Sequence, residues 1–343
     1  MPEKPAPSMQ DVANLAGVHR TTVSLALRKH PRIPLDTRMR VESAAQKLGY
    51  RVHPLLSALM QAHRTMRPAK DLAVLGWITA WPTRYGWRAP ENPIPDFMPG
   101  AVARAAELGY RIEDFWLTEP GMTAQRMSAI LRARNISGLI IGRLPPGLRV
   151  IELEWEHFSA VSIGVSLESP RLSHVAENHF HTGKLAFQSC AALGYRRLGL
   201  ALPQRLYARV QERFLGGFLA EQYAHPHLAR LPPLITEQLD EAAFRTWFKK
   251  NQPDVIICFN VDWVLPWLNR LGLRVPADIG VAGLAVDKTN GTHAGVALDP
   301  IRIGAMAVEM LVGMVHRNER GLPQEEQEIL YRPRWIAGAT LKQ

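Results

Sequence analysis

The first 50 residues contain three short stretches in which apolar residues recur at the spacing of a helix. In the first, Ser8 and Asp11 can form a capping box, and Gly17 is suited to end the helix in a left-handed conformation. The second, residues 20–28, has an apolar stripe and a polar outer face, and the third, residues 34–49, begins with proline and closes on glycine. This pattern predicts a helix-turn-helix unit whose second helix has the shape to fit the major groove of a duplex.

From residue 72 onward, short apolar runs typical of buried strands alternate with longer amphipathic segments. The predicted strands are residues 72–79, 111–117, 138–142, 160–164, 198–202, 255–259 and 279–282. The clearest predicted helices are residues 98–108, 123–134, 183–193 and 303–315. This alternation predicts an α/β region of doubly wound parallel sheets with crossover helices.

Charge separates the helix-turn-helix segment from the rest of the chain. The whole chain of 343 residues has a net charge of +10, and residues 1–70 hold 12 lysines and arginines against four acidic residues, a net of +8. A concentrated positive field favours binding to a polyanion such as DNA, because each neutralised phosphate releases a counterion. Charge alone leaves a solvated basic face or a membrane-surface patch as alternatives. The helix-turn-helix pattern of the same segment favours DNA binding over these alternatives.

Several other classes of protein are disfavoured by the sequence. The first ten residues have no apolar core and no run approaches about 20 apolar residues, so we expect no signal peptide, no membrane partner and a cytoplasmic location. Cys190 and Cys258 each lie in an apolar run and are expected to fill the core. His174, His179 and His181 lack a distant acidic or cysteine partner, so no metal or other cofactor is predicted. No catalytic motif is present, and we expect no enzyme activity.

The N-terminal segment resembles the lactose and galactose repressor (LacI/GalR) family of transcription regulators. Residues 11–24 read Asp-Val-Ala-Asn-Leu-Ala-Gly-Val-His-Arg-Thr-Thr-Val-Ser, followed by Thr-Arg-Met-Arg-Val-Glu at 37–42 and Leu-Gly-Tyr at 48–50. Residues 136–141, 193–199 and 272–280 resemble the family's effector domain more loosely. The resemblance implies a lambda-repressor-like head followed by a two-lobe region of the periplasmic-binding-protein type.

The resemblance also implies which residues touch DNA. Arg20 and Thr21 would reach base edges, and Leu25, where the family usually has arginine, could touch a thymine methyl but cannot donate to guanine. The implied phosphate contacts are His19, Thr22, Ser24, Arg28 and Thr37. His19 stands where a capping serine or threonine is common, so a weaker helix cap is expected.

Residues 53–60 resemble the family's hinge helix, and the resemblance implies that Leu59 wedges into the minor groove. The alternative is that these leucines begin the core of the next domain. The predicted organisation is a helix-turn-helix domain over 8–52, a hinge and linker over 53–70, and a two-lobe region over 71–343. The lobes are assigned as about 71–165 plus 300–320, and about 166–299 plus 321–343.

Ligands of open α/β sheets bind at the carboxyl ends of strands, so loops following the predicted strands hold the candidate effector contacts. These candidates are Trp77, Trp81, Arg213, Asn260, Asp262 and Trp263. The alternatives are ordinary packing for the tryptophans in and after the first strand and a surface ion pair for Arg213. Val261 splits the family's Asn-Asp pair, and Ala285 replaces a familiar sugar-hydroxyl acceptor. Either the effector is not a well-known sugar bound in the familiar way, or effector control is weak.

The expected function is therefore a homodimeric transcription regulator that binds a near-palindromic operator in double-stranded DNA. We expect a small-molecule effector, a carbohydrate being one candidate. Repression is the default implied by the resemblance, with activation left open. Two alternatives are a binding protein that only senses a solute and a DNA-tethered sugar enzyme.

Overall fold

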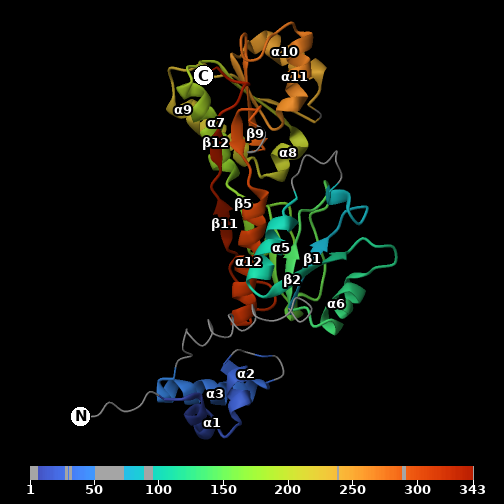
Figure 1. Cartoon of the computed structure of the whole chain (residues 1–343), viewed down its shortest axis with the longest axis vertical. Helices are drawn as coiled ribbons and strands as arrows, with labels where there is room; N and C mark the ends of the chain where they lie inside the picture. The colour runs from blue at the N-terminus through green and yellow to red at the C-terminus, as the bar shows by residue number, and fades with distance from the viewer. Residues whose placement is uncertain are drawn as a thin grey trace, which may run out of the picture.

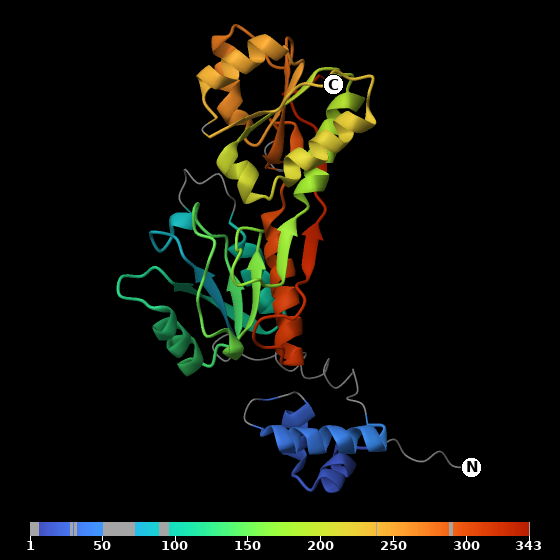
Figure 2. The same ribbon diagram turned by 180° about the vertical axis from the view of Figure 1, so that it is seen from behind.

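The computed structural model describes residues 7–27, 30, 33–50, 73–88, 96–237, 239–287 and 291–342. Within these ranges the chain forms a three-helix unit and two α/β lobes, seen from opposite sides in Figures 1 and 2. The predicted hinge at 53–60 and the candidate DNA contacts Arg28 and Leu59 lie outside the described residues.

Three helices, α1 (Met9–Ala16), α2 (Arg20–Leu27) and α3 (Leu35–Leu48), form the N-terminal unit. The predicted capping box is present: the Asp11 amide donates to the Ser8 hydroxyl, and the Asp11 carboxylate accepts from the Ser8 amide. The cap residue Gly17 has φ +64°, a left-handed conformation that glycine adopts without strain. Small apolar side chains from all three helices make the core: Val12, Ala13, Ala16, Val23, Ala26, Val41, Ala44 and Ala45. The helix-turn-helix prediction is confirmed.

The first lobe is a six-stranded sheet in the order β11-β5-β4-β3-β1-β2, with every pairing parallel. The strands are β1 (Ala73–Thr79), β2 (Tyr110–Trp116), β3 (Gly138–Ile141), β4 (Ser159–Ile163), β5 (His174–Glu177) and β11 (Glu328–Tyr331). Helices α5 (Met98–Glu107) and α12 (Pro300–Arg317) cover one face of the sheet, and α6 (Ala124–Ala133) covers the other. Two short 3-10 turns, Gly86–Arg88 and Trp155–His157, lie in its loops.

The second lobe repeats this plan in the order β12-β10-β9-β8-β6-β7. Its strands are β6 (Leu198–Pro203), β7 (Leu234–Thr236), β8 (Val255–Cys258), β9 (Gly280–Val286), β10 (Gly295–Ala297) and β12 (Arg334–Ile336), and only β12 is antiparallel. One face carries α7 (His179–Ala192), α8 (Gln204–Arg209) and α9 (Arg213–Ala224); the other carries α10 (Glu241–Asn251) and α11 (Val261–Arg270). Cys190 and Cys258 are buried on opposite faces, as core fillers.

The predicted fold class is confirmed, but the chain crosses between lobes at places other than those predicted. The sequence placed 166–299 and 321–343 wholly in the second lobe, whereas β5 and β11 pair in the first sheet, with His174 opposite Glu328. The crossings therefore follow Glu177, Ala297 and Tyr331. The prediction failed because β5 and β11 have four residues each and lack a long apolar run.

A pair of closely crossing helices supports each sheet. In the second lobe, a Cβ on Gly217 would lie 2.0 Å from the Phe180 carbonyl oxygen, and one on Gly183 would lie 2.2 Å from the Phe214 carbonyl oxygen. In the first lobe, Gly304 approaches the Phe97 carbonyl oxygen in the same way. Because no side chain fits at these crossings, the glycines fix the separation of the paired helices.

Candidate functional site

The N-terminus of α2 is held in place by local hydrogen bonds in the turn before it. The Thr21 amide donates to His19 Nδ1 at 3.4 Å, and the amides of Thr22 and Val23 donate to the His19 carbonyl oxygen at 2.9 and 3.1 Å. The Thr21 hydroxyl lies 2.9 Å from the same ring nitrogen. His19 thus acts as the N-cap of α2, through a longer bond than a serine or threonine cap normally makes.

The outer face of α2 presents the polar groups that the sequence singled out. His19, Arg20 and Thr21 are exposed, while Val23 and Ala26 are buried against α1 and α3. The remaining described candidates are half-buried: Thr22, Ser24, Leu25 and Thr37. A guanidinium at the start of a short exposed helix can reach two acceptors on a guanine edge, and hydroxyls suit phosphate oxygens.

A second candidate site is a cavity of about 400 Å³ between the two lobes. Residues near the carboxyl ends of strands and the loops after them line it from both sides. The first lobe contributes Trp81, Arg143, Leu148, Arg149, Val165, Ser166 and Glu168, and the second contributes Arg205, Arg209, Gln211, Phe259 and Trp263, among others. Its size is within the range of small-molecule sites, and its position is the one at which open α/β sheets bind ligands.

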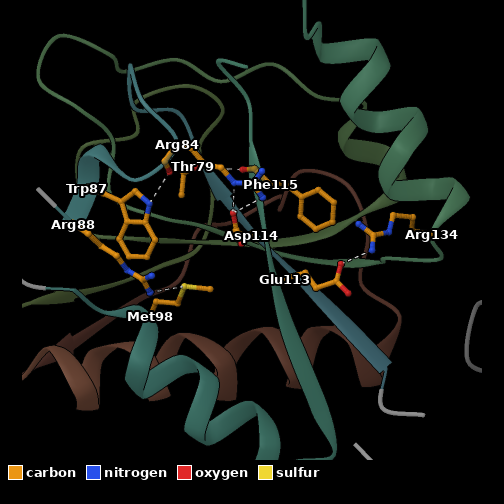
Figure 3. Close-up of polar contacts among 9 residues, drawn as sticks. All are labelled: Thr79, Arg84, Trp87, Arg88, Met98, Glu113, Asp114, Phe115 and Arg134. Carbon is orange, nitrogen blue, oxygen red and sulfur yellow. Dashed lines mark hydrogen bonds and ion pairs between the residues drawn. The ribbon is translucent and has the colours of Figure 1, made fainter. Parts of the chain in front are cut away.

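The loop after β1 carries Trp81 to the cavity and is fastened to the first lobe by polar contacts. Arg84 forms an ion pair with Asp114 of β2 at 3.1 Å, and the Trp87 indole donates to the Arg84 carbonyl oxygen at 3.3 Å (Figure 3). Arg88 donates to the sulfur of Met98 at 3.4 Å in the same view. The Trp81 indole itself donates to the Arg143 carbonyl oxygen at 2.8 Å. These bonds fix the aromatic wall on the first-lobe side.

Two arginines line the cavity from opposite lobes. Arg143 follows β3, and burial together with the nearby Arg209 lowers the pKa of its guanidinium well below the ordinary value. Burial and the charge of Arg149 lower the pKa of Arg209 to about 10. Among the described residues, no carboxylate lies within ion-pair distance of either guanidinium. Both side chains also line a smaller adjoining cavity of about 40 Å³.

The adjoining cavity contains two further titratable groups. Burial raises the pKa of the Glu177 carboxyl to about 7, although the hydroxyl of Thr182 donates to it and Arg143 is nearby. Burial and the positive charges of Arg143 and Arg213 lower the pKa of His179 to about 3. His179 Nδ1 is buried without a hydrogen-bond partner. At neutral pH the imidazole is therefore uncharged.

The structure brings only two of the six predicted effector residues to this cavity, Trp81 and Trp263. Trp77 is 2% exposed and packs in the first-lobe core beside Trp87, with ring centroids 6.1 Å apart. It faces the core because it lies within β1, whereas Trp81 lies beyond the end of that strand. Trp77 therefore corresponds to the core-packing alternative.

The other three predicted residues make contacts away from the cavity lining. Arg213 forms an ion pair with Glu328 at 2.6 Å, the surface salt bridge considered as its alternative. The Asn260 side chain caps α11 by accepting from the Asp262 amide at 2.9 Å. Asp262 is exposed and lies 3.4 Å from His293 Nε2.

Sequence reasoning missed Arg143, Arg209 and Phe259 as cavity residues, together with the adjoining Glu177 and His179. Arg143 had a usable signal, because it is a charged residue two positions after the buried strand β3. Arg209 had none, since only the tertiary fold brings α8 over the first lobe.

Among the residues that the structure describes, no group of three or more His, Cys, Asp or Glu side chains is placed to hold a metal ion. No helix in the described part of the chain is long and apolar enough to cross a membrane.

Comparison with protein families matches both parts of the chain. Residues 8–52 match the family described as bacterial regulatory proteins, lacI family, and residues 187–341 match the periplasmic binding protein-like domain. The first match covers the three-helix unit, and the second covers most of the second lobe. The chain belongs to the LacI family of bacterial regulatory proteins.

Curated relatives of this LacI-family protein are transcription regulators, and they match it over most of their length. It is 25% identical to the HTH-type transcriptional regulator GntR of Escherichia coli K12, over 94% of this chain and 96% of GntR. It is 23% identical to the lactose operon repressor of the same organism, over 80% of this chain and 74% of the repressor. The protein is therefore a DNA-binding transcription regulator of the repressor type, and these relatives are not enzymes.

Solved structures share the fold of this LacI-family chain. A complex of the transcriptional regulator CelR with cellobiose aligns with a TM-score of 0.58 and 18% identity, covering 97% of this chain and 99% of CelR. The lac repressor dimer bound to operator and the anti-inducer ONPF aligns with a TM-score of 0.56 and 18% identity, covering 99% of this chain and all of the lac repressor chain. Both likenesses support the arrangement of a helix-turn-helix head followed by two parallel-sheet lobes.

Proposed function

We propose that this repressor binds a near-palindromic operator as a homodimer and that a small molecule in the interlobe cavity changes its affinity for DNA. The observation that carries the DNA-binding part is the exposed start of α2, where Arg20 and Thr21 project from a rigid, capped helix within a segment of net charge +8. Arg20, Thr21 and Leu25 read bases, and His19, Thr22, Ser24, Arg28 and Thr37 hold phosphates.

Selection of bound duplexes from a random pool tests this part. The expected consensus is two inverted half-sites, because a two-fold symmetric dimer places two copies of α2 on one face of the duplex. A consensus with a single half-site would contradict the dimer, and the absence of any consensus would contradict sequence reading.

The hinge proposal rests on the sequence, since residues 53–60 lie outside the described part of the chain. Leu59 inserts at the centre of the operator, so Leu59→Ala should weaken binding to the selected site and leave binding to random duplex nearly unchanged. Equal losses on both duplexes would favour the alternative that Leu59 belongs to a domain core.

An exposed apolar row on the second lobe supports the homodimer. Leu219 and Tyr223, four residues apart on α9, are 40% and 79% exposed, and Phe180 of α7 is 43% exposed. The Phe180 ring lies beside Gly216, one helical turn before Leu219, so the three side chains follow one line. A contiguous row of this kind is typical of a protein-protein interface.

Sedimentation of the purified protein tests the dimer. Leu219→Glu should shift the wild-type dimer toward monomer, because it introduces a charge into an apolar contact. Val150→Glu is the matched control, since Val150 is 50% exposed on a first-lobe loop away from α9. A dimer that tolerates Leu219→Glu would place the interface elsewhere.

The two-lobe arrangement supports effector control. The lobes are joined by three crossing segments, and the cavity is lined from both, so a ligand that contacts both lobes favours their closed arrangement. A change in lobe arrangement would alter how the paired subunits present their heads to DNA. The corresponding experiment is operator binding in the presence and absence of candidate ligands.

A further inference from the structure

We infer that the interlobe cavity takes a small organic anion, with a carboxylate or phosphate held between Arg143 and Arg209 and an uncharged body against the aromatic wall. This inference rests on the proposed effector role of the cavity and names the chemical class of the effector. The two arginines line the same space from different lobes.

A buried guanidinium is costly unless it is paired with a group of opposite charge. Arg209 donates one hydrogen bond to the Leu144 carbonyl oxygen, and the Trp81 indole engages only the backbone carbonyl of Arg143, not its side chain. A guanidinium has five N–H donors, so each arginine retains donors for a ligand. Arg209 also raises the electrostatic cost of a charged Arg143, because it is one of the groups that depress the pKa of Arg143. An anion between them would relieve both costs.

The other charged groups in the two cavities offset the charge of this pair only in part, although Glu177 is close enough to favour the charged form of Arg143. Arg149 and Glu168 form an ion pair with each other, and Arg205 is exposed. Glu177 lies in the adjoining cavity, accepts from Thr182, and has a pKa near 7, so it is only partly ionised at neutral pH. With both glutamates ionised, the four arginines that line the described cavities still leave an excess of two positive charges.

The geometry also defines the uncharged part of the ligand. Phe259 and Trp263 pack with ring centroids 6.1 Å apart on one side, and Trp81 lies on the other. A cavity of about 400 Å³ is far larger than a bare phosphate needs, and aromatic walls suit a ring or carbon chain.

A neutral sugar fits this chemistry less well. It would surround the two guanidinium groups with hydroxyls and leave their charge uncompensated in a desolvated space. A carboxylate or phosphate instead accepts paired hydrogen bonds from the planar fork of arginine. Carboxylate and phosphate share this chemistry, and the experiment separates them.

The test uses the full-length protein and matched sets of ligands built on one monosaccharide: glucose, glucuronate and glucose 6-phosphate, with the corresponding galactose and mannose sets. Inorganic phosphate serves as the bare ion. Thermal unfolding and titration calorimetry measure binding at constant ionic strength. At least one anionic member should raise the melting temperature and bind roughly 10-fold to 100-fold more tightly than its neutral parent. A carboxylate or a phosphate preference identifies which anion the cavity takes.

Substitutions of the two arginines then test where the anionic group binds. Arg143→Gln and Arg209→Gln should each lower the affinity for the anionic ligand by roughly 10-fold to 100-fold and leave any binding of the neutral parent unchanged. Arg245→Gln is the control, because Arg245 is exposed on α10 outside both cavity linings, and the substitution should weaken binding of the anion by less than about 3-fold. If Arg143→Gln fails to fold, Arg143→Lys keeps the charge but not the paired donors, and the Arg209 variants test the second lobe independently.

Three results would overturn the inference: no anionic member binds, the neutral parent binds as tightly as its anions, or the arginine variants bind the anion as well as wild type does. Binding to the selected operator is measured on the same preparations. Retained operator binding that responds to a neutral sugar would overturn the anion and leave the proposed function standing. Loss of sequence-selective DNA binding in wild type would instead overturn the proposed function.

Discussion

The guanidinium of Arg209 donates a hydrogen bond to the backbone carbonyl oxygen of Leu144 across the boundary between the lobes. Arg209 ends α8 in the second lobe, and Leu144 follows β3 in the first. The bond therefore joins the lobes at the edge of the cavity that they share. It also orients Arg209 beside Arg143, so one side chain both holds the lobes together and contributes to the binding surface.

Removing this contact should loosen the lobes. Arg209→Ala deletes a largely buried, charge-assisted hydrogen bond. Its loss should reduce the free energy that favours the closed arrangement of the lobes by roughly 1.5 to 3 kcal/mol. Small-angle scattering should then report a larger radius of gyration, and acrylamide should quench tryptophan fluorescence more strongly. Arg205→Ala, on the same helix but exposed, should leave both unchanged. Unchanged scattering in Arg209→Ala would mean that other contacts hold the lobes.

The buried Glu177 should give stability a defined pH dependence. Its pKa is about 7 in the folded chain against an ordinary 4.5, so the folded state binds more protons between these values and stability falls as pH rises through them. Glu177→Gln removes this titration and keeps the hydrogen bond from Thr182. From pH 4.5 to 7.5, wild type should lose up to about 3 kcal/mol relative to Glu177→Gln in denaturant unfolding.

The comparison with Glu177→Gln is needed because His179 acts in the opposite direction. Its pKa is lowered to about 3, so its contribution to stability falls as pH drops below its ordinary value of 6.5. The two effects oppose each other between pH 4.5 and 6.5 in wild type. A wild-type and Glu177→Gln pair with parallel pH profiles would show that the carboxyl is ionised at an ordinary pKa.

Neighbouring glycines on α9 provide a matched test of the helix crossing. Gly217→Ala would place a methyl 2.0 Å from the Phe180 carbonyl oxygen, so it should destabilise the protein by roughly 1 to 3 kcal/mol. Gly216→Ala would place the same methyl 3.5 Å from the Phe180 ring, an ordinary contact, and should stabilise by about 0.5 to 1 kcal/mol. Thermal unfolding distinguishes them. Equal effects of the two substitutions would argue against a close crossing.

Substitution of Arg20 tests base reading by α2. Arg20→Ala should relax the preference at one base position of each half-site by about 1 to 3 kcal/mol in a comparison of single-base operator variants. Arg40→Ala is the control, because Arg40 is exposed on α3, pairs with Asp36 at 3.7 Å, and should affect all sequences alike. An unchanged preference in Arg20→Ala would remove this residue from the base-reading set.

Local features of the fold could be predicted where neighbouring residues determine them. Ser8, Asp11 and Gly17 specify the limits of α1 within one helix length, and four-residue apolar runs such as Gly138–Ile141 identify central strands. Strands β5 and β11 were missed because each has only four residues and they pair with each other across a long stretch of chain, 154 positions for His174 and Glu328. The predicted lobe boundaries were wrong for the same reason.

The residues of the candidate sites were likewise predictable only where nearby sequence determines their position. Arg20 and Thr21 were identifiable because the helix that exposes them is encoded nearby in the sequence. Trp77 and Trp81 look equivalent in sequence, yet the end of β1 separates them, so one fills the core and the other lines the cavity. Arg143 and Arg209 are 66 positions apart in the chain, and only the packing of the two lobes brings them together.

Sequence-specific DNA binding is tested by a competition between the selected operator and a scrambled duplex of the same length and base composition, followed by fluorescence anisotropy at two salt concentrations. Wild-type protein should prefer the operator by roughly 1,000-fold or more, and binding to both duplexes should weaken as salt rises. Equal affinity for the two duplexes would contradict sequence-specific DNA binding.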